Sequence, residues 1–281
     1  MNEEETPVAK RTTVRQKYAI VAEGGCCGPR GDTSGCCAPA SDPDELAAAI
    51  GYSREDLDKI PGGANMGLSC GNPAAIAALN EGEVVVDLGS GAGFDAFLAG
   101  PKVGQSGRVI GVDMTQEMLD KARKNTESYT QRTGLSNIEF RLGEIEYLPL
   151  ADNSVDVIIS NCVLNLSTDK QQVWKEISRV LKPGGRVCAS DIALFKSLPE
   201  KVKEKVENWV GCVAGAIIID DYRQMIEEAG LEVKELKPKP EYVETLVATG
   251  DAFYKQIQDG LDGKLPQEYV TSIDVLALQK S

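Results

Sequence analysis

Residues 84–95 read Val84-Val85-Val86-Asp87-Leu88-Gly89-Ser90-Gly91-Ala92-Gly93-Phe94-Asp95. The consecutive valines predict a buried strand, because β-branched side chains pack well in extended backbone. The three glycines predict a tight turn that a ligand can approach closely. The apolar residues 94–99 then predict a helix. Strand, glycine turn and helix in this order open a nucleotide-binding α/β unit.

A second apolar run strengthens this interpretation. Residues 108–113 end in Asp113, at the distance along the chain where such folds hold ribose hydroxyls. The glycine pattern is G-x-G-x-G, preceded by an aspartate at the strand tip, and it resembles motif I of S-adenosylmethionine-dependent methyltransferases. The alternative for the two motifs is a turn that binds no ligand. The resemblance implies that the cofactor-binding residues here are Asp87, Gly89, Gly91, Asp113 and Met114.

Composition narrows the class of protein. The chain has 281 residues and a net charge of −13, which argues against a nucleic-acid partner because phosphate binding needs a basic patch. It contains no apolar run long enough to span a membrane, and its acidic first residues do not look like a signal peptide. With 8 cysteines and no histidine, it is expected to be cytoplasmic and to carry out metal, metalloid or redox chemistry. A monomer is the expected oligomeric state.

The order of the remaining elements predicts the fold class. Helices are expected at 12–22, 42–59, 74–79, 93–100, 116–130, 170–181, 198–213, 220–229 and 254–260. Strands are expected at 83–88, 108–113, 138–142, 156–161, 186–192, 231–236 and 272–278, the last of them antiparallel. Alternating strands and helices predict a doubly wound, Rossmann-like α/β sheet. We expect three parts: a helical, cysteine-rich extension at 1–65, a core at 66–195, and a C-terminal region at 196–281 that covers the substrate.

Two pairs of adjacent cysteines stand in a glycine- and proline-rich segment of the extension. They are Cys26, Cys27, Cys36 and Cys37. Such a segment predicts a loop, so these thiols are interpreted as mobile soft ligands or redox groups. A structural zinc knot or an incidental thiol-rich loop is the alternative, although the Cys-x-x-Cys spacing typical of zinc sites is absent. Cys188, within a strand, is expected to be a small buried hydrophobe.

Several further blocks carry a more specific resemblance. They are Ile159-Ser160-Asn161-Cys162-Val163-Leu164-Asn165-Leu166, Val180-Leu181-Lys182-Pro183-Gly184-Gly185, Ser190-Asp191, Gly211-Cys212-Val213-Ala214-Gly215-Ala216 and Ser69-Cys70-Gly71. Together with the N-terminal cysteine pairs they resemble the arsenite methyltransferase family, over about residues 12–281. The resemblance implies a class I methyltransferase fold and methyl transfer from S-adenosylmethionine to trivalent arsenic. It places the arsenic-binding cysteines at Cys70, Cys162 and Cys212, with one more among the four N-terminal cysteines.

Physical chemistry supports the same three cysteines. Ligands of open α/β sheets bind at the carboxyl ends of the strands. Cys162 follows the fourth strand, Cys212 lies in the excursion after the fifth, and Cys70 leads into the first. Thiolates are the preferred ligands of a soft centre. A trivalent arsenic held by three sulfurs keeps a lone pair, which is a nucleophile that carries no proton and needs no general base. A chain without histidine fits such chemistry.

Three more residues complete the expected cofactor site. Ile145 and Glu146 should flank the adenine, and Asn161 should lie near the reacting end. Trp209 either walls the pocket or packs in the core. The stretch 238–250 is interpreted as a cap over the substrate site. A thiol reductant, thioredoxin or a small thiol, is the expected partner besides arsenic.

Two other functions remain open at this point. One is a methyltransferase for a small organic or thiol substrate, in which three convergent cysteines would have no purpose. The other is a non-catalytic metalloid sensor on the same fold, against which the intact cofactor motifs argue.

Overall fold

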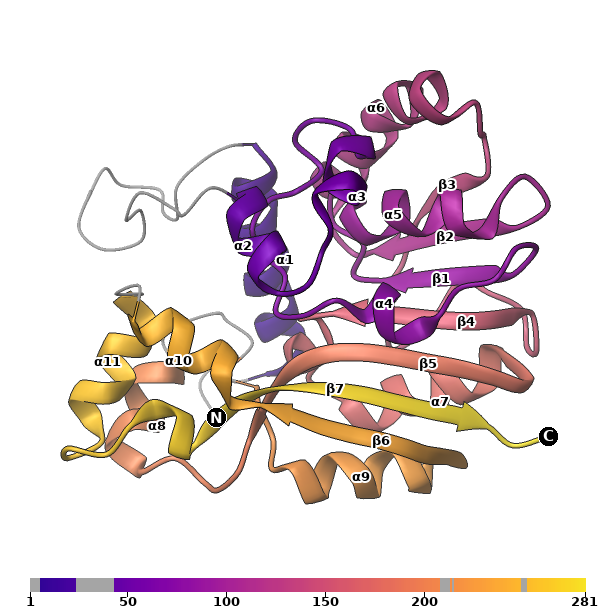
Figure 1. Cartoon of the computed structure of the whole chain (residues 1–281). Coiled ribbons are helices and arrows are strands. Elements are labelled where there is room, and N and C mark those ends of the chain that lie inside the picture. The colour runs from indigo at the N-terminus through magenta and orange to yellow at the C-terminus, as the bar shows by residue number, and fades with distance from the viewer. Residues whose placement is uncertain (1–5, 24–42, 208–212, 214, 249–251) are drawn as a thin grey trace.

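The computed structural model describes residues 6–23, 43–207, 213, 215–248 and 252–281. A seven-stranded sheet has the order β3-β2-β1-β4-β5-β7-β6 (Figure 1). The strands are β1 (Val84–Leu88), β2 (Arg108–Asp113), β3 (Ile138–Leu142), β4 (Val155–Asn161), β5 (Leu181–Leu194), β6 (Leu231–Lys239) and β7 (Val270–Gln279). The pairs among β1 to β5 are parallel, whereas β7 is antiparallel to both β5 and β6. The predicted α/β sheet with a final antiparallel strand is confirmed.

Helices cover both faces of this sheet. They are α1 (Pro7–Ala22), α2 (Pro43–Ala49), α3 (Arg54–Lys59), α4 (Pro73–Ala77), α5 (Phe94–Val103), α6 (Gln116–Thr133), α7 (Lys170–Val180), α8 (Glu200–Glu207), α9 (Ile219–Glu228), α10 (Pro240–Ala248) and α11 (Ala252–Gly260). One apolar layer joins the sheet to α5 and α6, and a second joins its other face to α7 and α9. Among the described helices, none combines the length and the apolar character needed to cross a membrane.

β1 is the centre of the arrangement. Val85 and Val86 are fully buried because this strand is covered on both faces. β1 pairs with β2 on one side and with β4 on the other, so the direction of winding reverses between β1 and β4. Such a reversal opens a crevice at the carboxyl ends of the strands. The ends of β1, β2 and β4 point toward α1 and α2 (Figure 1).

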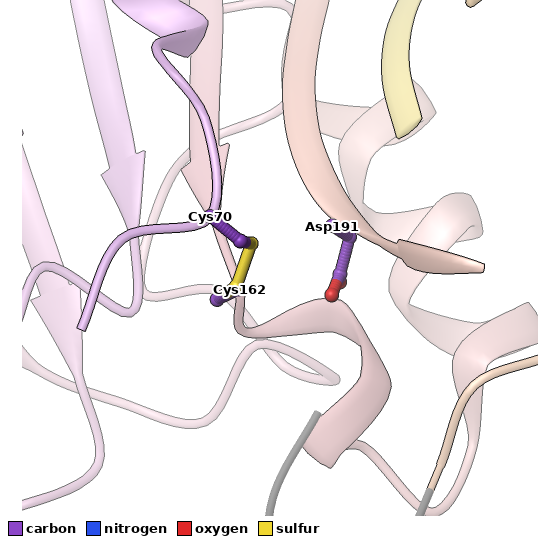
Figure 2. Close-up of side chains that lie close together, drawn as sticks. All are labelled: Cys70, Cys162 and Asp191. Carbon is purple, nitrogen blue, oxygen red and sulfur yellow. A yellow bond between two sulfur atoms is a disulfide. The ribbon is translucent and has the colours of Figure 1, made fainter. Parts of the chain in front are cut away.

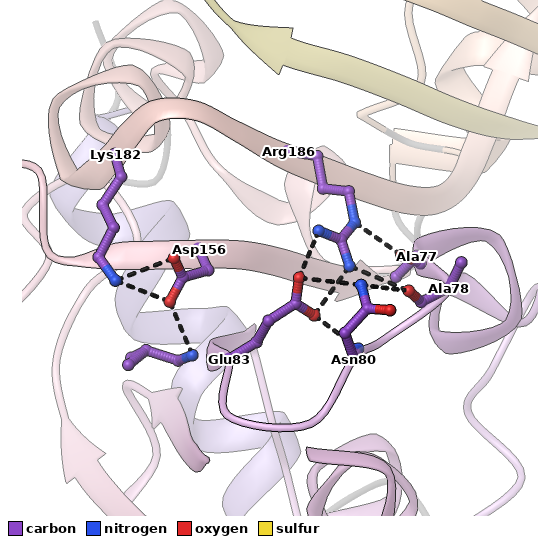
Figure 3. Close-up of polar contacts among 8 residues, drawn as sticks. Ala77, Ala78, Asn80, Glu83, Asp156, Lys182 and Arg186 are labelled. Atoms are coloured by element: carbon purple, nitrogen blue, oxygen red, sulfur yellow. Dashed lines mark hydrogen bonds and ion pairs between the residues drawn. The ribbon is translucent and has the colours of Figure 1, made fainter. Parts of the chain in front are cut away.

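Ion pairs secure the opposite end of the strands (Figure 3). Arg186 of β5 pairs with Glu83 at 2.7 Å and donates to the carbonyl oxygens of Ala77 and Ala78, where α4 ends. These carbonyls have no partner within their own short helix, so the guanidinium satisfies them. This contact fixes α4 on the sheet, and with it the preceding segment that contains Cys70.

The helix expected at 42–59 is wrong as a single element. The chain forms α2 and α3 instead, with a break at residues 50–53. Gly51 has a φ of 101°, which a helix does not allow, and the Ser53 hydroxyl caps α3 by accepting from Asp56 N at 3.1 Å. The apolar pattern alone did not reveal this serine cap. The break places Tyr52 in the interior, with 4% of its surface exposed.

Two further segments compare with expectation as follows. Within the helix predicted over 198–213, α8 is described over Glu200–Glu207 and Val213 lies in a turn, whereas residues 208–212 lie outside the described residues. The stretch 238–250 contains the end of β6 and then α10. α8, α10 and α11 share an apolar cluster with the ends of β5 and β7, beside the segment that carries Cys70. Trp209 lies outside the described residues.

Candidate functional site

The glycine turn after β1 depends on the absence of side chains. Gly89 has a φ of 65°, and a Cβ built on it would stand 2.4 Å from Cγ2 of Val163. The Asp113 carboxylate fixes the turn from β2: it accepts hydrogen bonds from Gly91 N at 2.9 Å and from Thr115 N at 2.8 Å. The two motifs predicted from the sequence are therefore in direct contact.

A cavity opens at the carboxyl ends of β1, β2 and β4. Its lining includes every residue that the sequence predicted for the cofactor: Asp87, Gly89, Gly91, Asp113, Met114, Ile145, Glu146 and Asn161. Cys162 and Val163 also line it. Glu146 is buried, and its carboxylate accepts a hydrogen bond from the Ser167 hydroxyl at 2.6 Å. The structure thus gathers these side chains around one space.

Two buried carboxylates face this cavity. Asp87 is 2% exposed and Asp95 is 5% exposed. Burial raises the pKa of Asp87 well above its usual value, and the charges of Asp95 and Asp113 raise it further. Burial also raises the pKa of Asp95, to about 6, although hydrogen bonds from Tyr52 and Asn161 oppose the rise. Among the described residues, no polar group pairs with Oδ2 of Asp87. An unpaired buried carboxylate oxygen suits a cationic ligand.

Asn161, at the end of β4, joins the cavity to Cys70. Its Nδ2 donates to Asp95 at 3.0 Å and to the Gly71 carbonyl at 2.9 Å. Its Oδ1 accepts from the backbone N–H of Cys70 at 3.0 Å. One amide therefore positions both a cavity carboxylate and a predicted arsenic ligand.

Cys70 and Cys162 come together at the rim of the cavity and form a disulfide, with 6.0 Å between their Cα atoms (Figure 2). Cys162 has a φ of 55°, which is uncommon for a residue other than glycine. This backbone conformation turns the chain away from the direction of β4. Sγ of Cys70 lies 3.5 Å from the Ser190 carbonyl oxygen. The predicted convergence of these two cysteines is present in the fold.

Asp191 is a neighbour that sequence reasoning missed. Its carboxylate and the two sulfurs lie within 4.8 Å of one another. The carboxylate accepts from the backbone and the side-chain amide of Asn165, at 3.1 and 2.9 Å. Burial raises the pKa of Asp191 to about 7. Its place directly after Ser190 at the end of a predicted strand was the available signal.

The N-terminal helix is a second feature that the sequence did not assign to the site. Arg11, Val14 and Tyr18 of α1 line the cavity, and the helix packs on α6. Arg11 is paired with Glu144, beyond β3, at 3.4 Å. α1 therefore covers the cavity from the outside.

The remaining predicted thiols are described only in part. Cys212, Cys26, Cys27, Cys36 and Cys37 fall outside the described residues, so their roles stay predictions. Cys188 is fully buried in β5, as predicted, and burial raises the pKa of its thiol to about 12.

Known proteins resemble this chain in sequence and in fold. A family model described as a methyltransferase domain matches residues 79–230. The arsenite methyltransferase of Halobacterium salinarum is 48% identical over 254 residues, 86% of this chain and 64% of that protein. That of Aquipseudomonas alcaligenes is 42% identical over 54% of this chain and 45% of its own length. The chain thus spans about two thirds or less of the length of these relatives.

A solved structure agrees with them. The arsenic(III) S-adenosylmethionine methyltransferase of Chlamydomonas reinhardtii is 32% identical to this chain, with a TM-score of 0.62 over 86% of this chain and 75% of that one. The cavity described above fits S-adenosylmethionine: the unpaired Asp87 oxygen suits a cation, and the bare backbone at Gly89 and Gly91 admits close approach. From the family model, the relatives and the site together, the chain belongs to the S-adenosylmethionine-dependent arsenite methyltransferase family.

Proposed function

We propose that this chain transfers methyl groups from S-adenosylmethionine to trivalent arsenic held by cysteine thiolates. The observation that carries the proposal is the meeting of Cys70 and Cys162 at the rim of a cavity that Cys162 itself lines. Cys212 is proposed as the third arsenic ligand. Soft sulfur ligands match a soft metalloid.

The cysteine pair must first be reduced. A dithiol reductant gives two electrons and two protons to the Cys70–Cys162 disulfide and becomes a disulfide itself, by thiol–disulfide exchange. Each protein thiol then replaces one hydroxyl group of arsenite, and water leaves with the thiol proton. We propose the N-terminal cysteines as mobile thiols that capture arsenic or take part in this exchange, and thioredoxin or a small thiol as the reductant.

The chain's residues then supply position rather than proton transfer. Bound S-adenosylmethionine provides a methyl group on a positively charged sulfur, and the arsenic lone pair is the nucleophile. Asp87, Asp113 and the glycine turn hold the cofactor, and Ile145 and Glu146 flank its adenine. Asn161 fixes the backbone of Cys70 relative to the cavity. α1 excludes water from the covered side. Alignment of two reactants in this manner lowers a barrier mainly through entropy.

Further parts of the proposal rest on the sequence. We propose residues 1–65 as a helical, cysteine-rich segment, 66–195 as the S-adenosylmethionine-binding core, and 196–281 as the region that completes the sheet and covers the substrate site. We place the protein in the cytoplasm, because eight cysteines without histidine suit a reducing compartment. A monomer is part of the same proposal.

The test is single-turnover methylation with labelled cofactor, a thiol, and arsenite or monomethylarsenite, followed by separation of the arsenic species. Cys162→Ser and Cys212→Ser should each lose at least about a hundredfold in rate with both substrates, because orientation contributes up to about 7–11 kcal/mol. Cys70→Ser should lose activity at least with arsenite, which engages three sulfurs where the monomethyl form engages two.

Cys188→Ala is the matched control, because this thiol is buried in β5 and should not contribute to arsenic binding. Cofactor affinity should be unchanged in all four variants. Near-normal turnover by Cys162→Ser or Cys212→Ser would contradict arsenic as the substrate and favour a small organic acceptor.

A further inference from the structure

Tyr52, which lies outside the methyltransferase core, contacts a residue that lines the cofactor cavity. It stands between α2 and α3, where Gly51 breaks the helix, and its side chain is buried against Phe94 with the ring centres 4.9 Å apart. Its hydroxyl donates to Oδ1 of Asp95 at 2.6 Å. A buried phenol thus binds a buried carboxylate that lines the cavity.

Asn161 completes a closed triangle with these two groups. Its Nδ2 lies 3.0 Å from Oδ2 of Asp95 and 3.1 Å from the Tyr52 hydroxyl oxygen. Tyr52 and Asn161 therefore hold one oxygen each of the same carboxylate. The arrangement joins the N-terminal segment, α5 and β4 by side chains that are distant in the sequence.

The buried carboxylates of this region favour a cationic ligand. Asp95 and Asp87 line one cavity, and among the described residues neither forms a salt bridge. The charged and titratable groups that face Asp95 are Tyr52, Asp87 on β1 and, further along α5, Lys102. Arg11 of α1 lines the same cavity, but it is paired with Glu144. S-adenosylmethionine carries a positive sulfonium and a positive amino group, so it supplies the missing charge.

We propose that Tyr52 is a positioning residue, which holds the Asp95 carboxylate in place for a cationic group of the bound cofactor. The proposal rests on cofactor binding by the proposed function and not on arsenic as the acceptor. It adds to the site a residue that lies before the region matched by the methyltransferase family model.

The hydroxyl also has an electrostatic effect. Burial raises the pKa of Asp95 to about 6, and the Tyr52 and Asn161 hydrogen bonds hold it down. Burial, first, and then the charge of Asp95 raise the pKa of Tyr52 itself well above its usual value, so the phenol stays a neutral donor. Removal of the hydroxyl should raise the pKa of Asp95 further. A cation binds the ionised carboxylate, so cofactor affinity rises as the pH passes the pKa of Asp95. The midpoint of this rise should lie at a higher pH in Tyr52→Phe than in the wild type.

The experiment is calorimetric titration with S-adenosylmethionine from pH 5.5 to 8.5. Tyr52→Phe should bind about threefold more weakly at pH 6.5 and like the wild type at pH 8.5, which corresponds to a midpoint shift of about one pH unit. The control is Tyr129→Phe, which removes another buried hydroxyl. Tyr129 lies on α6, outside the cavity lining, and its hydroxyl donates to Asn137 at 2.8 Å. This substitution should leave the profile unchanged.

A second variant keeps the test decisive if Tyr52→Phe is unstable. Asp95→Asn has no charge to hold, so it should remove the pH dependence that Asp95 contributes, and adding Tyr52→Phe to it should move the profile no further. A Tyr52→Phe profile that superposes on the wild type, or one that is weakened equally at every pH, would overturn the proposal. Wild-type protein that binds no S-adenosylmethionine would instead overturn the proposed function.

Discussion

The Asp113 carboxylate both shapes the glycine turn and lines the cofactor cavity. One oxygen accepts a hydrogen bond from Gly91 N and the other accepts from Thr115 N. Asp113→Ala should therefore weaken S-adenosylmethionine binding by more than tenfold, since hydrogen bonds to charged groups contribute about 1.5–3 kcal/mol. Calorimetry measures this change.

Asp120→Ala is the companion variant for this measurement. Asp120 lies on α6, close to the same loop, but it is exposed and contacts Gln116 rather than the turn. Its loss should leave the affinity as it is. Equal affinities in the Asp113→Ala and wild-type proteins would refute the ribose-binding assignment.

The role of a residue was predictable where a local sequence pattern indicates it. It was not predictable where the role depends on contacts with residues distant in the sequence. Gly89 and Asp113 stand at the ends of apolar runs, and this local pattern is sufficient to identify them. Tyr52 meets Asp95 across 43 residues and Asn161 across 109. Nothing near Tyr52 in the sequence distinguishes it from a core aromatic, so only the folded arrangement shows what its hydroxyl does.

α1 covers the cofactor cavity with few other attachments. Val14 is the buried residue of this helix and lines the cavity, whereas Val8 on the same helix is 64% exposed. Val14→Asn places an amide in this apolar contact. Losing part of the burial of a valine costs about 1.4 kcal/mol, so cofactor binding should weaken about tenfold.

Val8→Asn is the matched control, because it makes the same change on the solvent side. Circular dichroism should show both variants folded, since α1 packs on α6 and adds no strand to the sheet. Equal affinities of the two variants would mean that α1 is not a cover for the cofactor.

Element boundaries followed the sequence where a strand pattern was unbroken. β2 and β3 have the predicted limits, because β2 carries the apolar Val109, Ile110 and Val112 between polar ends and β3 alternates apolar with charged residues. The helix predicted at 42–59 failed, because Gly51 and the Ser53 cap act over a few residues inside an otherwise apolar and charged repeat. β5 begins at Leu181, five residues before the predicted start at Arg186. The reason is that Leu181 pairs with Val155 next to a shift in strand register, which no sequence pattern indicates.

The whole molecule bears a stability cost at its binding site. Burial, together with the charges of Asp95 and Asp113, raises the pKa of Asp87 in the folded state above that in the unfolded chain. The folded protein thus binds this proton more tightly, and the associated stability is lost as the pH rises above the usual aspartate value. Without cofactor, Asp87→Asn should therefore melt at a higher temperature than the wild type, by an amount that grows from pH 4 to pH 8.

The same variant should bind S-adenosylmethionine more weakly, so function and stability should move in opposite directions. Glu235→Gln is the control, because it removes one negative charge from an exposed position of a chain with net charge −13. Scanning calorimetry across this pH range gives the comparison. An Asp87→Asn protein that melts below the wild type at pH 8 would show that the buried charge is not a burden on the fold.

The Cys70–Cys162 bond also makes a covalent ring. The two cysteines are 92 positions apart, and the chain between them contains β1, β2, β3 and β4. Closing a ring of this size removes conformations from the denatured chain and favours the native one by about 4–5 kcal/mol. The dithiol form, which we propose as the one that binds arsenic, lacks this tether, so its native state is the less stable of the two. The cofactor cavity and the proposed arsenic site both include residues of this ring, so each ligand should replace part of the lost stability by mass action. The reduced protein therefore depends on its ligands for part of its folding stability, and the reduced form is the one that the proposed reaction requires.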